Sequence, residues 1–240
     1  MPDTPSESPQ SVTLRSVVAA YCERKLAEEM HDDWSFLIYR PFSWLLVPLL
    51  AHLRVRPTAV TLLGLGLALA LPLLAWRTGP AAWWAVGAGA FLFSVCDAVD
   101  GDLARCTRGG SVFGAWLDGQ VDLVYRVGAY AAVGIMAGAL PGSVLAGFNT
   151  VALALFSATL VLLARLARQA VSPPPAAGWP GWSAWRMTVP GFISGLDHLL
   201  PLLVLAFGAA GRLDWLLCWL VGYSLLDYAD AQWQALRARW

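Results

Sequence analysis

Residues 97–122 read DAVDGDLARCTRGGSVFGAWLDGQVD and contain five aspartates, four of which form two pairs at helical spacing within two long, mainly apolar segments. Asp97 and Asp100 are three residues apart, and Asp118 and Asp122 are four residues apart. Both spacings put the two side chains of a pair on one face of a helix. A carboxylate at the centre of a bilayer costs about 2.5–3.5 kcal/mol, so acids within a membrane helix indicate a functional site.

The composition is that of a membrane protein. Of the 240 residues, 58% are hydrophobic and only 13% are charged. Apolar stretches of about 20 residues are typical of transmembrane helices. We therefore predict an all-α integral membrane protein with six transmembrane helices. The six predicted spans are 58–76, 81–106, 111–139, 143–168, 189–208 and 212–236.

The segment before the first predicted span has a different character. Residues 14–30 mix apolar and charged side chains with helical periodicity, which predicts an amphipathic surface helix. Residues 34–53 are apolar but are interrupted by Pro41 and Pro48. We expect this segment to form an elbow at the membrane surface, with a full span as the alternative. The predicted domains are a disordered tail (1–11), an amphipathic juxtamembrane segment (12–56) and a six-helix transmembrane catalytic domain (57–240).

Positive charge is divided unevenly between the two sides of this topology. With the N-terminus in the cytoplasm, only Arg77 and Arg212 fall outside, and Arg126 falls within a span. The other thirteen lie inside: Arg15, Arg24, Lys25, Arg40, Arg54, Arg56, Arg105, Arg108, Arg165, Arg168, Arg186, Arg237 and Arg239. Lys and Arg concentrate in cytoplasmic loops, so we predict a cytoplasmic N-terminus and a multi-pass protein of a bacterial or archaeal cell membrane. Because the arginines form no basic stripe, we expect no nucleic-acid partner.

The two carboxylate pairs come to a similar depth because the second and third predicted spans are adjacent and antiparallel. That depth is roughly 10–15 Å from the cytoplasmic ends of the spans. Carboxylates this close repel each other unless cations keep them ionised. Oxygen ligands select Mg²⁺, Mn²⁺ or Ca²⁺, and four aspartates around two ions suit the displacement of a diphosphate. Asp102 points to another face, so we leave it out of the predicted site.

Small residues accompany the acids. Gly101, Ala104 and Gly114 remove side-chain bulk, so a flat ring or a phosphate could approach the helix backbone there. Close helix packing explains the same residues equally well. Arg105 could pair with a phosphate through its forked donors, or it could anchor the cytoplasmic end of the helix.

The complete pattern resembles the signature of the CDP-alcohol phosphotransferase family. It reads Asp97-x2-Asp100-Gly101-x2-Ala104-Arg105-x8-Gly114-x3-Asp118-x3-Asp122, and all eight defining positions match. The resemblance implies a six-helix membrane enzyme with an N-terminal surface helix, usually a homodimer, that uses two Mg²⁺ or Mn²⁺ ions. Such an enzyme transfers a phosphoalcohol from a CDP-linked donor to an acceptor alcohol and releases CMP.

The resemblance also implies a role for each position. Asp97, Asp100 and Asp118 would bind the two divalent ions. Asp122 would touch a metal and act as general base on the acceptor hydroxyl. The CDP site would be lined by Gly101, Ala104, Arg105 and Gly114.

The substrates are less well determined than the reaction. We expect CDP-diacylglycerol as the donor because the site opens to both lipid and cytoplasm. Residues 39–43 and the pattern Pro57-x3-Thr61 are similar to members that use inositol phosphate or related acceptors. An acceptor phosphate needs cations near the cytoplasmic mouth, and the candidates are Arg165 and Arg186.

Three alternatives stay open at this point. The enzyme could instead move a small CDP-linked headgroup onto a lipid or polyol. The Asp cluster could be the ion site of a cation transporter, although the carboxylates lie near one membrane face and the sequence shows no inverted repeat. A catalytically inactive relative is disfavoured by the eight intact positions.

Other acids in the predicted spans are not part of the signature. Asp197, Asp227 and Asp230 lie in or near the last two spans. We expect them to be solvated at helix ends or paired with Arg237.

Overall fold

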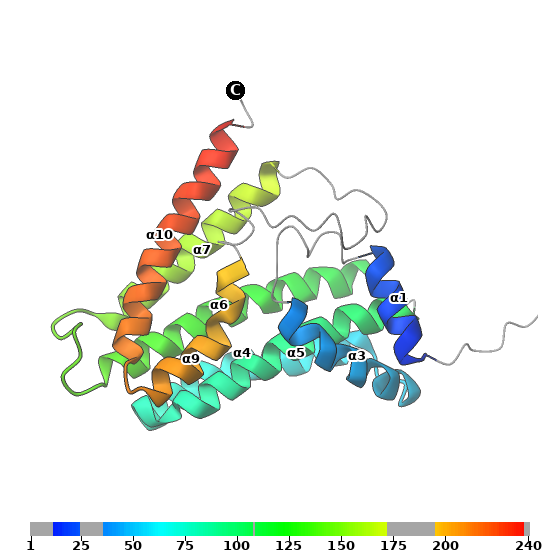
Figure 1. Ribbon diagram of the computed structural model, residues 1–240, viewed down its shortest axis with the longest axis horizontal. Coiled ribbons are helices and arrows are strands. Elements are labelled where there is room, and N and C mark those ends of the chain that lie inside the picture. The colour runs from blue at the N-terminus through cyan, green and yellow to red at the C-terminus, as the bar shows by residue number, and fades with distance from the viewer. Residues whose placement is uncertain (1–11, 25–35, 108, 172–194, 238–240) are drawn as a thin grey trace, which may run out of the picture.

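The computed structural model describes residues 12–24, 36–107, 109–171 and 195–237. These residues form helices joined by turns and include no strand, which confirms the predicted all-α fold (Figure 1). The helices are α1 (Leu14–Arg24), α3 (Phe36–His52), α4 (Pro57–Thr78), α5 (Trp83–Thr107), α6 (Val112–Gly138), α7 (Thr150–Val171), α9 (Leu200–Ala209) and α10 (Leu213–Arg237). Two 3₁₀ turns, η1 (Gly79–Ala82) and η3 (Leu196–Leu199), precede α5 and α9.

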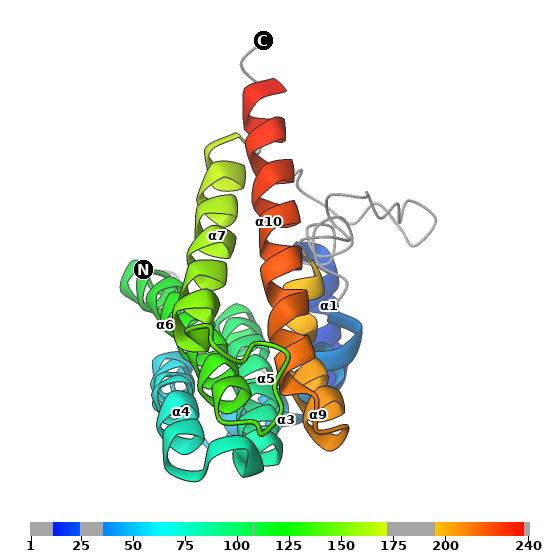
Figure 2. The same ribbon diagram turned by 90° about the vertical axis from the view of Figure 1, so that its left-hand side faces the viewer.

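Within the described residues, three stretches are long and apolar enough to cross a membrane, namely 57–107, 112–138 and 150–170. The first contains both α4 and α5, which are joined by η1 and pack side by side (Figure 2). A shorter apolar helical stretch covers 196–209.

The six predicted spans each contain a helix, but one boundary is different. α7 begins at Thr150 and not at residue 143, because residues 139–149 form turns. Gly142 and Gly147 adopt positive φ angles of 69° and 89° there, a conformation that glycine reaches without steric cost. The first part of the fifth predicted span lies outside the described residues.

α4 packs against both of the helices that carry the signature carboxylates. Its contacts with α5 and with α6 are extensive, whereas α5 and α6 contact each other little. The second and third predicted spans, expected to be adjacent and antiparallel, thus contact each other little and are linked mainly through α4. Glycine explains the close α4–α6 approach, because a Cβ at Gly128 would lie 2.7 Å from the backbone oxygen of Ala68.

The main core lies where α4, α6, α7 and α10 meet. Its buried side chains include Leu71, Met136, Ala158, Leu216 and Leu220. α7 and α10 pack along each other, and their C-terminal ends extend beyond the other helices (Figures 1 and 2). α9 packs against α5 and follows η3, which brings the η3 side chains to the carboxylate region.

α3 is a single helix through both of its prolines, which corrects the predicted interruption at Pro41 and Pro48. A proline removes one backbone hydrogen bond from a helix, but packing against α5 compensates for the loss. Tyr39, Ser43 and Val47, spaced one turn apart, are all buried. α1 packs on α3 and α5, and the part of the predicted amphipathic helix that follows α1 lies outside the described residues.

Replacing Gly128 by Ala is expected to destabilise the fold. The new methyl group would lie 2.7 Å from the Ala68 backbone oxygen, so α4 and α6 would have to separate. Overpacking of this kind costs about 1–3 kcal/mol, which exceeds or offsets the gain of about 1 kcal/mol from the helix propensity of Ala. Thermal unfolding of the purified protein in detergent should show a lower midpoint.

Gly66 on α4 is the matched control, because no atom lies within 4 Å of a Cβ added there. Gly66→Ala should leave the midpoint unchanged or raise it. Equal effects of the two substitutions would contradict the close contact between α4 and α6.

Candidate active site

Three of the four signature carboxylates interact with one another. Asp97 and Asp100 come from α5, and Asp118 comes from α6. Among charged groups, Asp118 acts most strongly on Asp97, and both of these acids act on Asp100. The structure thus brings together the three residues that the resemblance assigns to divalent ions, even though α5 and α6 contact each other little.

The three carboxylates differ in their access to solvent. Asp97 is exposed, Asp118 is half-buried and Asp100 is buried, with only 5% of its surface exposed. Thr61 on α4 donates a 2.6 Å hydrogen bond to Asp100 Oδ2, which holds the buried carboxylate in place. The sequence singles out Thr61 only within an acceptor-related pattern, because its contact with Asp100 depends on how α4 packs on α5.

The fourth carboxylate, Asp122, is paired with arginine. It forms an ion pair with Arg165 of α7, and its Oδ1 lies 3.5 Å from Nε of Arg126, one turn along α6. The Asp122 side chain is 16% exposed and that of Arg165 is 40% exposed. Arg165, predicted near the acceptor, therefore lies at the predicted general base. Arg186 lies outside the described residues.

Arg126 links Asp122 to a second buried acid. Its guanidinium forms an ion pair with Asp197 of η3, and Tyr130 donates a 2.9 Å hydrogen bond to the same carboxylate. His198 Nε2 lies 3.5 Å from Arg126 Nη2. The expectation that Asp197 is solvated or pairs with the last helix is therefore wrong, because η3 folds against α6.

A similar arrangement joins α7 to α10. Arg168 donates a 2.5 Å hydrogen bond to Asp227 Oδ1 and lies 3.4 Å from Asp230 Oδ2. Gln234 donates a further hydrogen bond of 2.7 Å to Asp230. The expected pairing of these acids with Arg237 is wrong, because Arg168 on the neighbouring helix α7 is their ion-pair partner.

The four residues predicted to line the CDP site lie around the C-terminal end of α5 and the start of α6. Gly101 faces Arg105, since a Cβ at Gly101 would lie 3.1 Å from Arg105 Nη2. The Gly114 N–H donates a 2.9 Å hydrogen bond to Ser111, the N-cap of α6. Ala104 is half-buried. These contacts account for the small residues without a ligand, so their assignment to CDP stays a prediction.

Asp102, which the sequence analysis left out of the site, is 1% exposed and contacts a predicted site residue. Its Oδ1 accepts a 2.7 Å hydrogen bond from Arg105. Its Oδ2 accepts one of 2.6 Å from Ser43 and lies 3.3 Å from Arg40, both on α3. The spacing of Asp102 and Arg105 on one helix is visible in the sequence, whereas the contacts with Ser43 and Arg40 are not, because these residues come from an element about 60 residues earlier in the chain.

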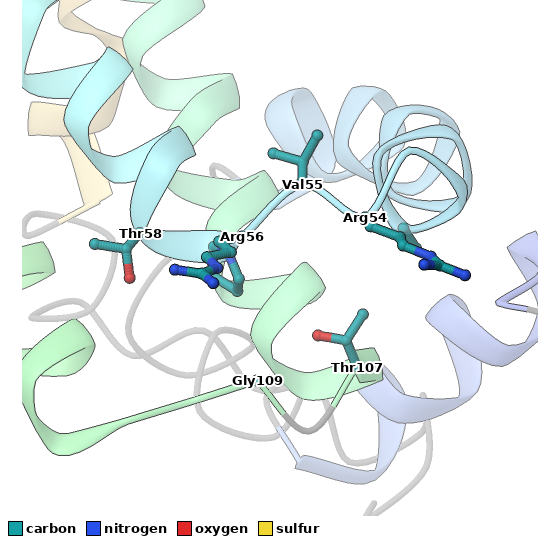
Figure 3. A pocket seen from close by; sticks show the side chains of 8 residues that line it. Arg54, Val55, Arg56, Thr58, Thr107 and Gly109 are labelled. Atoms are coloured by element: carbon teal, nitrogen blue, oxygen red, sulfur yellow. The ribbon is translucent and has the colours of Figure 1, made fainter. Parts of the chain in front are cut away.

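A pocket of about 450 Å³ opens beside this region, where the α3–α4 turn meets the ends of α4 and α5 (Figure 3). Arg54, Arg56, Thr58, Thr107 and Gly109 line it. In Figure 3, Arg56 extends toward Thr58 while Arg54 points to the opposite side. Two arginines and the N-terminus of α4 make the pocket electropositive. None of these residues belongs to the site predicted from the sequence.

The acids do not form a closed metal-ligand set. Among the described residues, no three His, Cys, Asp or Glu side chains are grouped closely enough to hold a metal ion. Asp97, Asp100 and Asp118 interact with one another, and Arg165 and Arg126 supply positive charge beside Asp122; the joint metal site of the four aspartates stays a prediction. The remaining donor set still fits a hard divalent cation, because three carboxylates repel one another in a partly buried region.

Comparison with known proteins agrees with the sequence signature. The family model for CDP-alcohol phosphatidyltransferase matches residues 54–222, a segment that includes all eight signature positions. A phosphatidylinositol phosphate synthase of Corynebacterium glutamicum is 41% identical over 76 residues. This alignment covers 32% of the chain and 34% of the relative, so the chain matches about a third of that relative's length. The family match extends over well more than half of the sequence, and the chain belongs to the CDP-alcohol phosphatidyltransferase family.

Proposed function

We propose that the protein transfers a phosphatidyl group from CDP-diacylglycerol to an acceptor alcohol and releases CMP, as a step of phospholipid biosynthesis. Family membership supports the reaction class. The name of the Corynebacterium relative supports a phosphatidyl donor and a phosphorylated inositol acceptor. The observation that carries the proposal is the interacting trio Asp97, Asp100 and Asp118, with Asp122 one helical turn further along α6.

Asp97, Asp100 and Asp118 would hold Mg²⁺ or Mn²⁺, with Asp122 at the edge of the same site. Two such ions, when bound, neutralise a diphosphate and stabilise the charge that develops on the leaving CMP. The contribution of the chain is to hold three repelling carboxylates in place. Thr61 fixes the most buried of them through its hydrogen bond to Asp100.

Asp122 would be the general base. The acceptor oxygen attacks the phosphatidyl phosphorus, its proton passes to the Asp122 carboxylate, and the bond from that phosphorus to the CMP oxygen breaks. Arg165 is the more exposed of the two arginines beside Asp122, whereas Arg126 is held by Asp197. Arg165 is therefore the partner that an incoming acceptor would displace.

An acceptor that carries its own phosphate suits this displacement. Its phosphate would attract the Arg165 guanidinium away from Asp122. The Asp122 carboxylate could then accept a proton from the bound acceptor. Arg126 would stay behind to orient Asp122. This exchange supports inositol phosphate or a similar polyol phosphate over an uncharged alcohol.

The donor nucleotide would lie over Gly101, Ala104 and Gly114, with its diphosphate near Arg105. The electropositive pocket adjoins these residues, because Thr58 Oγ1 would lie 4.0 Å from a Cβ at Gly114. An anionic donor is favoured there by the arginines and by the α4 N-terminus.

The six-span arrangement belongs to the same proposal. The six predicted spans, which contain α4, α5, α6, α7, α9 and α10, would cross a bacterial or archaeal cell membrane, with the N-terminus and the site on the cytoplasmic side. α1 and α3 would lie at the cytoplasmic surface as the juxtamembrane segment 12–56, after a tail of residues 1–11. The one-sided distribution of Lys and Arg supports this orientation. The homodimer rests on the family resemblance alone.

The purified full-length protein, given CDP-diacylglycerol and Mg²⁺, should release CMP when inositol phosphate is added. Acceptors for comparison are inositol, glycerol phosphate and serine. Chelation of the metal with EDTA should abolish release, and Mg²⁺ or Mn²⁺ should restore it. A folded protein that releases no CMP with any of these acceptors would overturn the proposal.

Asp122→Asn should lower kcat for CMP release by about 100-fold or more, since general-base catalysis contributes on the order of 10²–10⁴. Asp230→Asn is the control, because Asp230 also pairs with an arginine of α7 but lies outside the carboxylate site. It should retain activity. Unchanged kcat in Asp122→Asn would remove Asp122 from the role of base.

Arg165→Gln tests whether the acceptor is a polyol phosphate and not an uncharged alcohol. The variant should raise KM for inositol phosphate by about tenfold or more, because it removes one charge-assisted contact with the phosphate. KM for CDP-diacylglycerol should change little. An equal effect on both substrates would show that Arg165 only maintains the fold.

A further inference from the structure

Asp102 lies between the juxtamembrane helix α3 and an arginine of the predicted donor site. Each of its carboxylate oxygens has a different partner. Oδ1 accepts the 2.7 Å hydrogen bond from Arg105. Oδ2 accepts the 2.6 Å hydrogen bond from Ser43 and lies 3.3 Å from Arg40. The acid is therefore oriented from one side by α3 and acts on Arg105 from the other.

The α3 side of this arrangement is fixed by several contacts. Arg40 donates a 3.0 Å hydrogen bond to the backbone oxygen of Ala98 on α5, and its guanidinium lies 5.1 Å from the ring of Tyr21 on α1. Ser43 is fully buried. Because α1, α3 and α5 meet at these side chains, the position of Asp102 Oδ2 is set by how α3 sits on α5.

The Arg105 side is held by fewer contacts. Its guanidinium lies over Gly101, where an added Cβ would come within 3.1 Å of Nη2 and 3.3 Å of Nη1. Its Nε is buried and makes no hydrogen bond within the described structure. Asp102 is thus the group that determines where this guanidinium points.

We propose that Asp102 is a positioning residue for the donor site. Contacts from α3 hold its Oδ2, so that Oδ1 points at Arg105. The hydrogen bond to Oδ1 then orients the Arg105 guanidinium toward the donor diphosphate. The inference rests on the proposed function, because the resemblance assigns Arg105 to the CDP donor. It adds that donor affinity depends on the juxtamembrane helix, which carries none of the signature residues.

Two substitutions break the arrangement at different points. Asp102→Asn replaces one carboxylate oxygen by an NH₂ donor, which would then face a hydroxyl donor or a guanidinium. Ser43→Ala leaves the sequence of α5 unaltered and removes the hydroxyl that bonds Asp102 Oδ2 at 2.6 Å and lies 3.1 Å from the Ala98 backbone oxygen. Both should weaken donor binding, the first more than the second.

The test is a double-mutant cycle on the full-length protein between Asp102→Asn and Arg105→Gln. Each single variant should raise KM for CDP-diacylglycerol by about tenfold, as expected for the loss of a hydrogen bond between charged groups, with kcat nearly unchanged. In the Arg105→Gln background, Asp102→Asn should add little, because the two residues act as one unit. Ser43→Ala should raise the same KM by a smaller factor.

Asp214→Asn is the control for a general loss of stability. Asp214, at the start of α10, is also 1% exposed, and it accepts hydrogen bonds from the backbone N–H groups of Val144 and Trp215. Val144 lies in the turns that follow α6, whereas the site lies at the start of α6. It should leave KM for the donor unchanged. Thermal unfolding midpoints of all variants identify any that fail to fold, in which case Ser43→Ala decides the question.

Independent, multiplying effects of Asp102→Asn and Arg105→Gln would overturn the positioning role, and so would an unchanged donor KM in Ser43→Ala. The same cycle measured as CDP binding by calorimetry separates this inference from the proposed reaction. Wild-type protein that binds CDP with coupled effects at the two positions, but transfers nothing, would retain the positioning role and refute phosphatidyl transfer.

Discussion

The repulsion among Asp97, Asp100 and Asp118 is the constraint around which the rest of the structure is arranged. Three acids in a helical, mostly apolar environment are unfavourable unless each meets a hydrogen-bond donor or a positive charge. Asp100 meets Thr61. Asp97 is acted on by Arg40, His198 and Arg126, from three different elements. Side chains from α3, α4, α6 and η3 therefore meet the acids of α5 in one region.

Two further acids extend this arrangement to the neighbouring elements. Asp122 joins α6 to α7 through Arg165, and Asp197 joins η3 to α6 through Arg126. The hydroxyl of Tyr39 on α3 donates a 2.6 Å hydrogen bond to the His198 backbone oxygen. Ion pairs thus link Asp122, Arg126, Arg165 and Asp197 across α6, α7 and η3, and Arg126, Arg165 and Asp197 come from outside the signature.

The sequence predicted well whatever depends on periodicity within one helix. Helical spacing placed Asp97 and Asp100 on one face of α5, and the long apolar stretches placed a helix in each predicted span. Prediction from the sequence failed for features that depend on packing between helices. The extensive contact of α4 with both α5 and α6, and the continuity of α3 through Pro41 and Pro48, follow from tertiary contacts that override local preferences. The pairing of Asp102 with Ser43 joins residues 59 positions apart, for which local spacing carries no signal.

The most direct measurement is the position of Mn²⁺ bound to the full-length protein together with CDP, located by anomalous X-ray scattering. If the signature acids form a donor-activating site, the ion will lie within about 2.0–2.6 Å of carboxylate oxygens of Asp97, Asp100 and Asp118, the range of Mg²⁺ and Ca²⁺ distances to oxygen ligands. Asp122 will lie at the edge of the same site. An ion bound elsewhere, with these three acids left without metal in the presence of CDP, would contradict this site.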